Sequence, residues 1–235
     1  MTRKRQAARI LVVDDEEDIL NLLEFNLTRA GFECIKATDG PEALVLASAE
    51  RPTLVLLDIM LPNMEGTEVL RRLKGDAATR GIPVVMLTAK GEEVDKIVGF
   101  ELGAEDYITK PFSPRELVLR VKAVLKRASE AAEAGAAGAG VMSAGPIRLD
   151  TERHRVTVDG AVVEFSNIEF RLLAALMGSR GRVLTRDVLL DSVWGHDCFV
   201  TPRTVDTHVR RVRAKLGPAA EYVETVRGVG YRFGE

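Results

Sequence analysis

Short apolar runs alternate with amphipathic stretches over the first half of the chain. Residues 54–57 are four consecutive apolar residues without alternation, which is typical of a strand buried on both faces. Similar runs predict strands at 10–13, 34–37, 54–57, 84–87 and 107–108. Apolar residues at helical spacing predict helices at 19–30, 41–49, 66–74, 94–102 and 114–127. Five strands that alternate with five helices predict an α/β fold, with a doubly wound parallel sheet covered by helices on both faces.

The second half of the chain has a different pattern. Three short runs separated by turn residues predict a small antiparallel sheet at 147–149, 155–158 and 162–165. Ser166 and Glu169 have the spacing of a capping box and predict a helix, with two more helices expected at 186–193 and 201–216. Alternating residues around two glycines predict a hairpin at 222–233. Three helices followed by a hairpin predict an α+β winged helix-turn-helix domain.

Residues 128–145, between these halves, are dominated by Ala, Gly, Ser and Glu. The first part favours an extension of the preceding helix, and the glycines from Gly135 onward favour a flexible tether. We therefore expect one domain at 1–127, a flexible linker at 128–145 and a second domain at 146–235.

Composition restricts the class of protein. Of 235 residues, 46% are hydrophobic and 29% are charged, a balance typical of a folded globular chain. The apolar stretches all fall short of the ~20 residues that cross a bilayer, and residues 1–9 lack a signal-peptide pattern. Cys34 and Cys198 lie far apart, without the spacing of metal ligands. We therefore expect a cytoplasmic protein with no membrane partner.

Polar residues follow four of the predicted strands. They are Asp14 and Asp15 after the first strand, Asp58 after the third, Thr88 after the fourth and Lys110 after the fifth. Because the carboxyl ends of parallel strands meet at one edge of the sheet, these side chains should lie together. Three carboxylates repel one another unless a cation neutralises them, and oxygen ligands suit Mg²⁺. With a hydroxyl and a lysine, this set predicts phosphoryl transfer through an aspartyl-phosphate.

Residues 9–127 resemble the flavodoxin-like receiver domain of two-component response regulators. The matching motifs are Val12-Val13-Asp14-Asp15-Glu16, Leu57-Asp58-Ile59-Met60-Leu61-Pro62 with Gly66, Leu87-Thr88-Ala89, Gly103-Ala104 through Asp106-Tyr107, and Lys110-Pro111-Phe112. The resemblance implies that Asp58 accepts a phosphoryl group from the phosphohistidine of a sensor histidine kinase. It also implies that Mg²⁺ is bound by Asp15, Asp58 and the Met60 carbonyl, with Asp14 assisting.

The same resemblance implies how phosphorylation is transmitted. Lys110 would pair with the phosphoryl group, while Thr88 moves toward it and Tyr107 turns inward as the second member of a switch pair. The Lys110–Pro111 peptide is expected to be cis. The phosphorylated protein is expected to form a homodimer through a charged face formed by Lys96, Asp106, Glu116 and Arg120.

The helix predicted at 201–216 separates apolar from basic residues. Its apolar face is formed by Val205, Val209, Val212 and Leu216. The opposite face carries Arg203, Thr207, Arg210 and Ala214, flanked by Arg211 and Arg213, while His208 and Lys215 lie nearer to the apolar edge. Residues 203–215 contain five Lys and Arg residues and one acid, a local charge of +4. An arginine-rich face of this kind suits the DNA major groove, the alternative being a solvated basic helix.

This half resembles the output domain of the OmpR/PhoB type. The matching residues are Arg203-Thr204-Val205-Asp206, His208, Arg210-Arg211, Arg213 and Thr225-Val226-Arg227-Gly228-x-Gly230-Tyr231. The resemblance implies that the helix reads the major groove of promoter DNA and that the hairpin approaches the minor groove through Arg227. The contacts it implies are Arg203, Thr204, Thr207, His208, Arg210, Arg211, Arg213, Lys215, Thr225, Arg227 and Tyr231. The stretch between Trp194 and Arg203, where the family meets RNA polymerase, is not diagnostic here.

Together these features predict a transcription regulator of a two-component system, controlled by phosphorylation of Asp58. Its only catalysis would be its own phosphoryl uptake and slow autodephosphorylation, so we do not expect an enzyme. One alternative is a haloacid-dehalogenase-like phosphatase, although that class has Asp-x-Asp after its first strand, whereas Asp14 and Asp15 are adjacent. A second alternative is a DNA-binding protein that no longer responds to phosphorylation.

Overall fold

The computed structural model describes residues 7–89, 102–136, 140–195 and 202–234, and it divides into units at Met1–Lys126 and Arg127–Glu235. The strands of the first unit are β1 (Arg9–Val13), β2 (Glu33–Ala37), β3 (Leu54–Asp58), β4 (Val84–Ala89) and β5 (Asp106–Lys110). Its helices are α1 (Glu17–Arg29), α2 (Gly40–Glu50), α3 (Gly66–Gly75) and the start of α5 (Pro114–Ala136). The helix predicted at 94–102 lies, apart from residue 102, outside the described residues.

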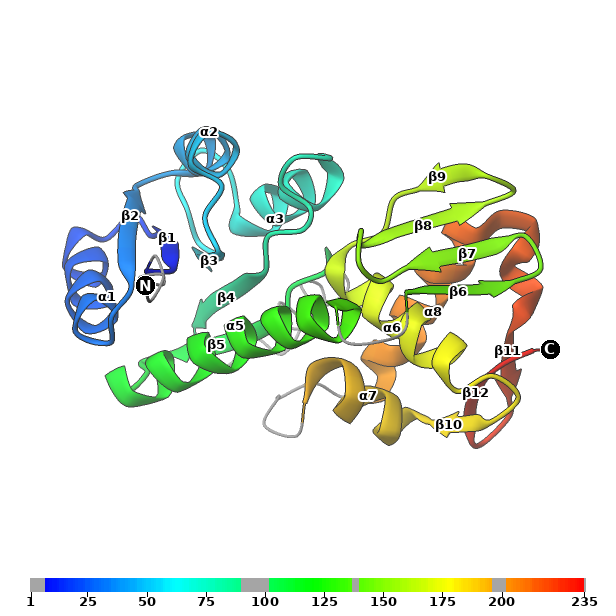
Figure 1. Ribbon diagram of the computed structural model, residues 1–235. Helices are drawn as coiled ribbons and strands as arrows, with labels where there is room; N and C mark the ends of the chain where they lie inside the picture. The colour runs from blue at the N-terminus through cyan, green and yellow to red at the C-terminus, as the bar shows by residue number, and fades with distance from the viewer. Residues whose placement is uncertain (1–6, 90–101, 137–139, 196–201, 235) are drawn as a thin grey trace, which may run out of the picture. The chain divides into compact units, whose positions relative to one another are not determined.

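The five strands form one parallel sheet in the order β2-β1-β3-β4-β5, which confirms the predicted doubly wound fold. β3 lies at its centre, and residues 54–57 are all 0% exposed. Leu23 of α1 and Val121 of α5 belong to the same buried cluster as Leu56, so these two helices cover one face. α2 and α3 lie on the other face (Figure 1). Successive residues of each strand therefore face opposite layers of helices.

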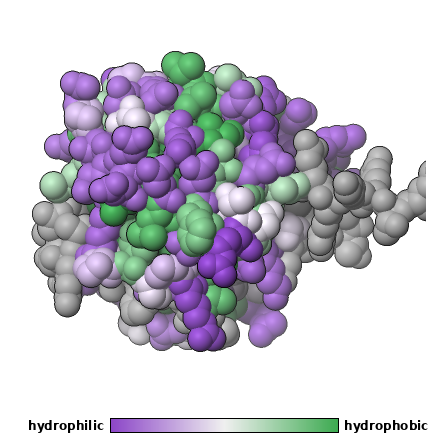
Figure 2. All heavy atoms as spheres, turned by 90° about the vertical axis from the view of Figure 1, so that its left-hand side faces the viewer, coloured by the Kyte–Doolittle hydropathy of each residue, from purple (hydrophilic) through white to green (hydrophobic). Residues whose placement is uncertain are grey.

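The surface of this unit is largely hydrophilic, with apolar side chains between the polar ones on the face seen in Figure 2. α1 leaves Leu22 and Phe25 42% and 58% exposed. The Arg29 guanidinium lies 5.4 Å from the centroid of the Phe25 ring, within the range of a cation–π contact. Part of the exposed apolar surface is thus covered by a neighbouring cation. None of the helices in the described parts of the chain is long and apolar enough to span a membrane.

The turn after β3 requires a glycine. The Gly66 N–H donates to the Ile59 carbonyl at 2.8 Å, which closes the turn between β3 and α3. A Cβ atom at Gly66 would lie 1.9 Å from the Asp58 carbonyl oxygen, so a larger residue fits only if the end of β3 moves. α3 therefore begins directly against the backbone that carries Asp58.

The second unit contains, after the last residues of α5, an antiparallel sheet in the order β6-β7-β8-β9. Its strands are β6 (Val141–Ala144), β7 (Ile147–Asp150), β8 (Arg155–Val158) and β9 (Ala161–Val163). Residues 141–145 belong to the predicted linker, but β6 pairs with β7 along its whole length. A boundary at residue 146 would therefore cut a strand from its sheet. β6 was missed because it follows a stretch of small residues and has little apolar patterning of its own.

The helices and the hairpin follow the predicted order. They are α6 (Asn167–Gly178), α7 (Arg186–Trp194), α8 (Pro202–Leu216), a 3₁₀ turn at Gly217–Tyr222, and the hairpin β11 (Val223–Val226) and β12 (Gly230–Phe233). Ser166 and Glu169 form both hydrogen bonds of the capping box at the start of α6, as predicted. The structure adds β10 (Val183–Thr185), which pairs with β12 and is too short for its alternation to show in the sequence. Three helices and a hairpin confirm the winged helix-turn-helix.

Replacing Gly66 with alanine should destabilise the first unit by roughly 2–3 kcal/mol, because the new methyl group overlaps the Asp58 carbonyl. Gly75, at the other end of α3, provides a matched control, since a Cβ atom there would meet nothing within 4 Å. Gly75→Ala should change stability by less than about 1 kcal/mol. Urea unfolding followed by circular dichroism measures the difference, and equal midpoints for the two variants would contradict the prediction.

Candidate functional site

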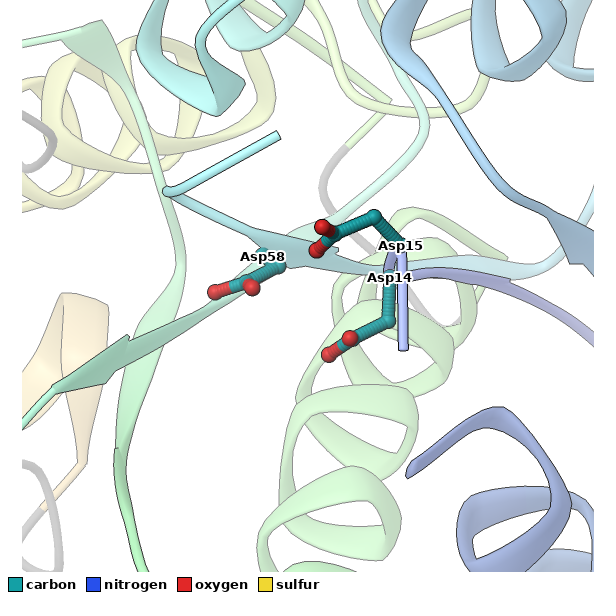
Figure 3. Close-up of side chains that lie close together, drawn as sticks. All are labelled: Asp14, Asp15 and Asp58. Atoms are coloured by element: carbon teal, nitrogen blue, oxygen red, sulfur yellow. The ribbon is translucent and has the colours of Figure 1, made fainter. Parts of the chain in front are cut away.

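Three carboxylates meet at the carboxyl edge of the parallel sheet. Asp14 and Asp15 follow β1, and Asp58 is the last residue of β3 (Figure 3). One ligand oxygen from each lies within 4.8 Å of the others. Asp14 and Asp58 are 0% and 5% exposed, whereas Asp15 is exposed to solvent. These three side chains thus lie together, as the sequence predicts.

Lys110, the last residue of β5, joins two of these carboxylates. Its Nζ atom donates to Asp14 Oδ2 at 2.7 Å and to Asp58 Oδ2 at 2.9 Å. The peptide bond between Lys110 and Pro111 is cis, as expected. One ammonium group therefore ties together the ends of β1, β3 and β5.

Among the described residues, the carboxylates of this cluster outnumber the cations that pair with them. Burial raises the pKa of the Asp58 carboxyl, Lys110 opposes this change, and the Asp14 carboxylate adds to it. For Lys110, burial alone would lower the pKa, but its hydrogen bonds to Asp14 and Asp58 raise it overall. Lys110 therefore stays cationic, and within the described part of the chain it is the one ammonium that pairs with this set of three carboxylates, through Asp14 and Asp58. A hard divalent cation with oxygen ligands fits the remaining negative charge.

Thr88 and Tyr107, the predicted switch pair, lie on the neighbouring strands β4 and β5. Thr88 is 0% exposed and Tyr107 is 3% exposed. In the strand register Thr88 pairs with Thr109, which places Tyr107 two residues before the position opposite Thr88. Tyr107 is therefore already inward in this structure, and the movement of Thr88 toward a phosphoryl group remains a prediction.

The charged face predicted to form a dimer is paired within the chain. Arg120 Nη1 lies 3.2 Å from Asp106 Oδ2, and Arg120 Nε lies 3.1 Å from Glu116 Oε1. Lys96 lies outside the described residues. Pairing of these charges across a dimer would require Arg120 to exchange partners, so that assignment remains a prediction.

The predicted DNA-binding residues divide into two groups. Arg203, Arg210, Thr225 and Arg227 are exposed, and Thr207 and Arg211 are partly exposed, so these six offer surface to a ligand. Four of the six belong to α8 and lie on its polar side, as the helical period predicts. The exposed group contains most of the arginine charge of α8.

The second group is committed to contacts inside the unit. His208 is 0% exposed and its ring lies 5.2 Å from the Trp194 ring, so the prediction that it contacts DNA is wrong for this structure. His208 lies three residues after Val205 and four before Val212, which places it on the apolar face of α8 with the Trp194 ring against it. Thr204 and Tyr231 are only 9% and 5% exposed.

Two cations of the predicted set also have internal partners. Arg213 Nε donates to the Val223 carbonyl at 2.8 Å, and its Nη2 donates to the Thr225 hydroxyl at 2.8 Å. Lys215 Nζ lies 2.5 Å from Glu169 Oε2, a carboxylate 46 residues earlier in the chain. No local pattern could reveal this pair. Sequence reasoning also missed Arg186, which reaches α8 from the start of α7 and donates to Asp206 at 2.7 Å.

Comparisons with known proteins agree with this geometry. The family model for the response regulator receiver domain matches residues 10–122, and the model for the C terminal part of transcriptional regulatory proteins matches residues 160–233. The phosphate regulon transcriptional regulatory protein PhoB of Pseudomonas aeruginosa is 50% identical over 225 residues, 95% of this chain and 96% of that protein. The sensory transduction protein RegX3 of Mycolicibacterium smegmatis is 47% identical over 227 residues, 95% of this chain and 98% of that protein.

This chain belongs to the OmpR/PhoB family of response regulators. A solved structure of a RitR mutant has a TM-score of 0.81 at 27% identity and covers 97% of this chain and 100% of that one. The regulator is thus a phosphorylation-dependent transcriptional regulator of a two-component system. Membership of this family excludes the phosphatase alternative, because the family acts on transcription.

The Lys215–Glu169 pair gives the DNA-binding unit of this regulator a pH dependence. Burial alone would raise the pKa of Glu169, but the Lys215 ammonium and the Ser166 N–H together hold it below its ordinary value. A carboxyl group whose pKa is lowered by folding stabilises the folded state above its ordinary pKa. That stabilisation is lost as the pH falls through the folded pKa.

We expect the wild-type unit to lose stability below about pH 4.5 more steeply than a Glu169→Gln variant. At pH 7 the variant should be less stable by about 1–3 kcal/mol, because a charged partner of a buried hydrogen bond is removed. Trp194, the only tryptophan, reports unfolding of this unit by fluorescence. Glu152→Gln, at an exposed acid of the same unit, is the control. Parallel curves for wild type and Glu169→Gln would refute the assignment.

Proposed function

We propose that Asp58 is the phosphoacceptor of this regulator and that its phosphorylation by a sensor histidine kinase increases binding to promoter DNA. The arrangement of the carboxylates and Lys110 carries this proposal. Asp58 lies at the end of the central strand, 5% exposed, with Lys110 Nζ at 2.9 Å. An acceptor oxygen and a fixed cation are what a transferred phosphoryl group requires.

The residues around Asp58 also fit a divalent cation. Asp14, Asp15 and Asp58 supply carboxylate oxygens within 4.8 Å of one another, and the Met60 carbonyl completes the proposed ligands. Such a set of hard oxygen donors suits Mg²⁺, which keeps several waters and binds through few carboxylates. When bound, Mg²⁺ would neutralise charge on the phosphoryl oxygens.

In the proposed reaction, a carboxylate oxygen of Asp58 attacks the phosphorus of the kinase phosphohistidine. The phosphorus–nitrogen bond breaks as the new phosphorus–oxygen bond forms, and the released imidazole keeps the electron pair and takes up a proton. Lys110 Nζ, which already donates to Asp58, turns to an oxygen of the phosphoryl group. Slow attack of water on the same phosphorus returns the carboxylate and inorganic phosphate.

Phosphorylation would then be transmitted through β4 and β5. The Thr88 hydroxyl, at the end of β4, would donate to the new phosphoryl group, and Tyr107 would keep its inward position behind it. Lys96, Asp106, Glu116 and Arg120 would then pair charges across a homodimer. Exchange of the internal Arg120–Asp106 pair for an intermolecular one is the step that this mechanism requires.

The DNA-binding surface is proposed to consist of α8 and the hairpin β11–β12. Its contacts with bases and phosphates are the exposed or partly exposed residues Arg203, Thr207, Arg210, Arg211, Thr225 and Arg227. RNA polymerase is a proposed partner, through the loop between α7 and α8, which lies outside the described residues. We expect the regulator to act in the cytoplasm, where promoter DNA is found.

The names of two relatives suggest a signal. The PhoB protein of Pseudomonas aeruginosa is named for the phosphate regulon, and PhoP of Bacillus subtilis, 43% identical over 234 residues, is named for alkaline phosphatase synthesis. We extend this to the present chain as the proposal that phosphate availability is its stimulus. Genes for phosphate acquisition should then lie beside the genomic fragments that the phosphorylated protein selects.

Asp58→Ala should abolish the gain in DNA binding on phosphorylation, because the acceptor carboxylate is gone. Wild type and variant are treated with acetyl phosphate and Mg²⁺, and genomic fragments are selected while light scattering follows the oligomeric state. Wild type with a chelator in place of Mg²⁺ is the control and should also fail to respond. Equal binding by wild type and variant, without any response in either, would remove Asp58 from control of DNA binding.

Arg210→Ala should weaken DNA binding by about 1–3 kcal/mol without changing phosphoryl uptake, because Arg210 is exposed on the polar face of α8. If Arg210 contacts a phosphate, the slope of log affinity against log salt should also fall by about 1. Arg155→Ala removes the same charge from β8 and is the matched control. An affinity for Arg210→Ala equal to that of wild type would show that this face does not contact DNA.

A further inference from the structure

Asp206 is the only acid in residues 203–215, a stretch with five Lys and Arg residues. A carboxylate on a surface that meets phosphates opposes binding by charge repulsion. Its side chain is 42% exposed, so it is not removed from the surface of α8. The contacts of Asp206 indicate what offsets this unfavourable charge.

One oxygen of Asp206 accepts hydrogen bonds from two other elements of the unit. Arg186 Nε, in the first turn of α7, donates to Asp206 Oδ1 at 2.7 Å. The Tyr231 hydroxyl, on β12 of the hairpin, donates to the same oxygen at 2.6 Å. Asp206 therefore joins α8 both to α7 and to the hairpin through charge-assisted hydrogen bonds, which are the stronger kind.

Tyr231 is fixed by further contacts around its ring. The guanidinium groups of Arg186 and Arg213 lie 5.1 Å and 5.6 Å from the ring centroid, within the range of cation–π contacts. Arg213 in turn donates to the Val223 carbonyl and to the Thr225 hydroxyl on β11. Burial raises the pKa of Tyr231 and Asp206 raises it further, so the hydroxyl remains a donor at neutral pH.

We propose that Asp206 is a positioning residue for DNA recognition, which holds α8 and the β11–β12 hairpin in one fixed relation through Tyr231 and Arg186. The proposal rests on the proposed function, since it requires both α8 and the hairpin to contact the same duplex. Two elements fixed before binding need not be ordered during binding, and the entropy cost of association falls accordingly. This effect benefits a matched sequence most, because only that sequence engages both elements at once.

If Asp206 affected DNA binding only through its negative charge, its removal would have the opposite effect on the affinity. Removing a negative charge from a DNA-facing surface would strengthen binding to every duplex, whatever its sequence. A role in positioning weakens binding to the matched duplex while it leaves binding to other DNA unchanged or stronger. The ratio of the two affinities therefore separates the two roles.

The test compares full-length wild type with Asp206→Ala on two duplexes. One is a fragment that the wild-type protein selects from genomic DNA, and the other is a scrambled duplex of equal length and composition. We expect Asp206→Ala to bind the selected duplex at least about tenfold more weakly, with no loss on the scrambled duplex. Unchanged or tighter binding to the selected duplex, or equal weakening on both, would overturn the proposal.

Asp187→Ala, which removes an exposed acid next to Arg186, is the charge control and should leave the affinity ratio unchanged. Arg210→Ala in the same assay distinguishes a wrong assignment of the DNA-binding surface from a wrong assignment of the positioning role. If Arg210→Ala has no effect, the DNA-binding surface itself is wrongly assigned. If Arg210→Ala weakens binding and Asp206→Ala keeps the wild-type affinity for the selected duplex, only the positioning role fails.

Asp206→Asn and Tyr231→Phe provide a test that keeps the side-chain volumes, in case Asp206→Ala does not fold. Trp194 fluorescence checks folding of each variant. If the hydroxyl acts through Asp206, the double variant should lose less affinity for the selected duplex than the product of the two single losses. Fully multiplicative losses would mean that Tyr231 contacts DNA independently, and would overturn the proposal.

Discussion

Repulsion between carboxylates at the carboxyl edge of the parallel sheet is the constraint on which the first unit depends. Asp14 and Asp58 are buried side by side, and Lys110 is the described cation that donates to both. Buried charges of one sign are tolerated only when a counter-charge is fixed beside them. The proposed phosphoacceptor and its proposed cationic partner are therefore the same side chains, Asp58 and Lys110, that hold this edge of the sheet together.

The second unit faces the same physical problem with the opposite sign. Its third helix gathers cations for a polyanion, and its structure assigns some of those cations to internal partners. Arg213 holds the hairpin backbone and Lys215 holds the capping residue Glu169, while Arg203 and Arg210 stay exposed. Some basic residues of α8 thus stabilise the unit through internal contacts, and others are exposed on its surface. Only the exposed cations without these internal roles can exchange water and counterions for phosphates without disturbing the fold.

The parts of the structure that followed from the sequence are those governed by local or periodic rules. The consecutive apolar residues 54–57 predicted the central strand, and the spacing of Ser166 and Glu169 predicted the cap of α6. The convergence of Asp14, Asp58 and Lys110 followed from one further rule, that parallel strands end at a common edge. β6 and β10 were not predicted, because each becomes a strand only by pairing with a neighbouring strand, β7 and β12 respectively.

The sequence by itself determined which residues can serve each role, namely the carboxylates and lysine of the sheet edge and the basic face of α8. Only the tertiary structure decided which of these residues have partners inside the protein and which remain exposed. His208 is fully buried because the Trp194 ring lies against it, and Asp206 joins three elements because Arg186 and Tyr231 reach it from 20 and 25 residues away. Helical periodicity assigns a residue to a face of its own helix, but the partner across that face is set by packing between elements distant in the chain.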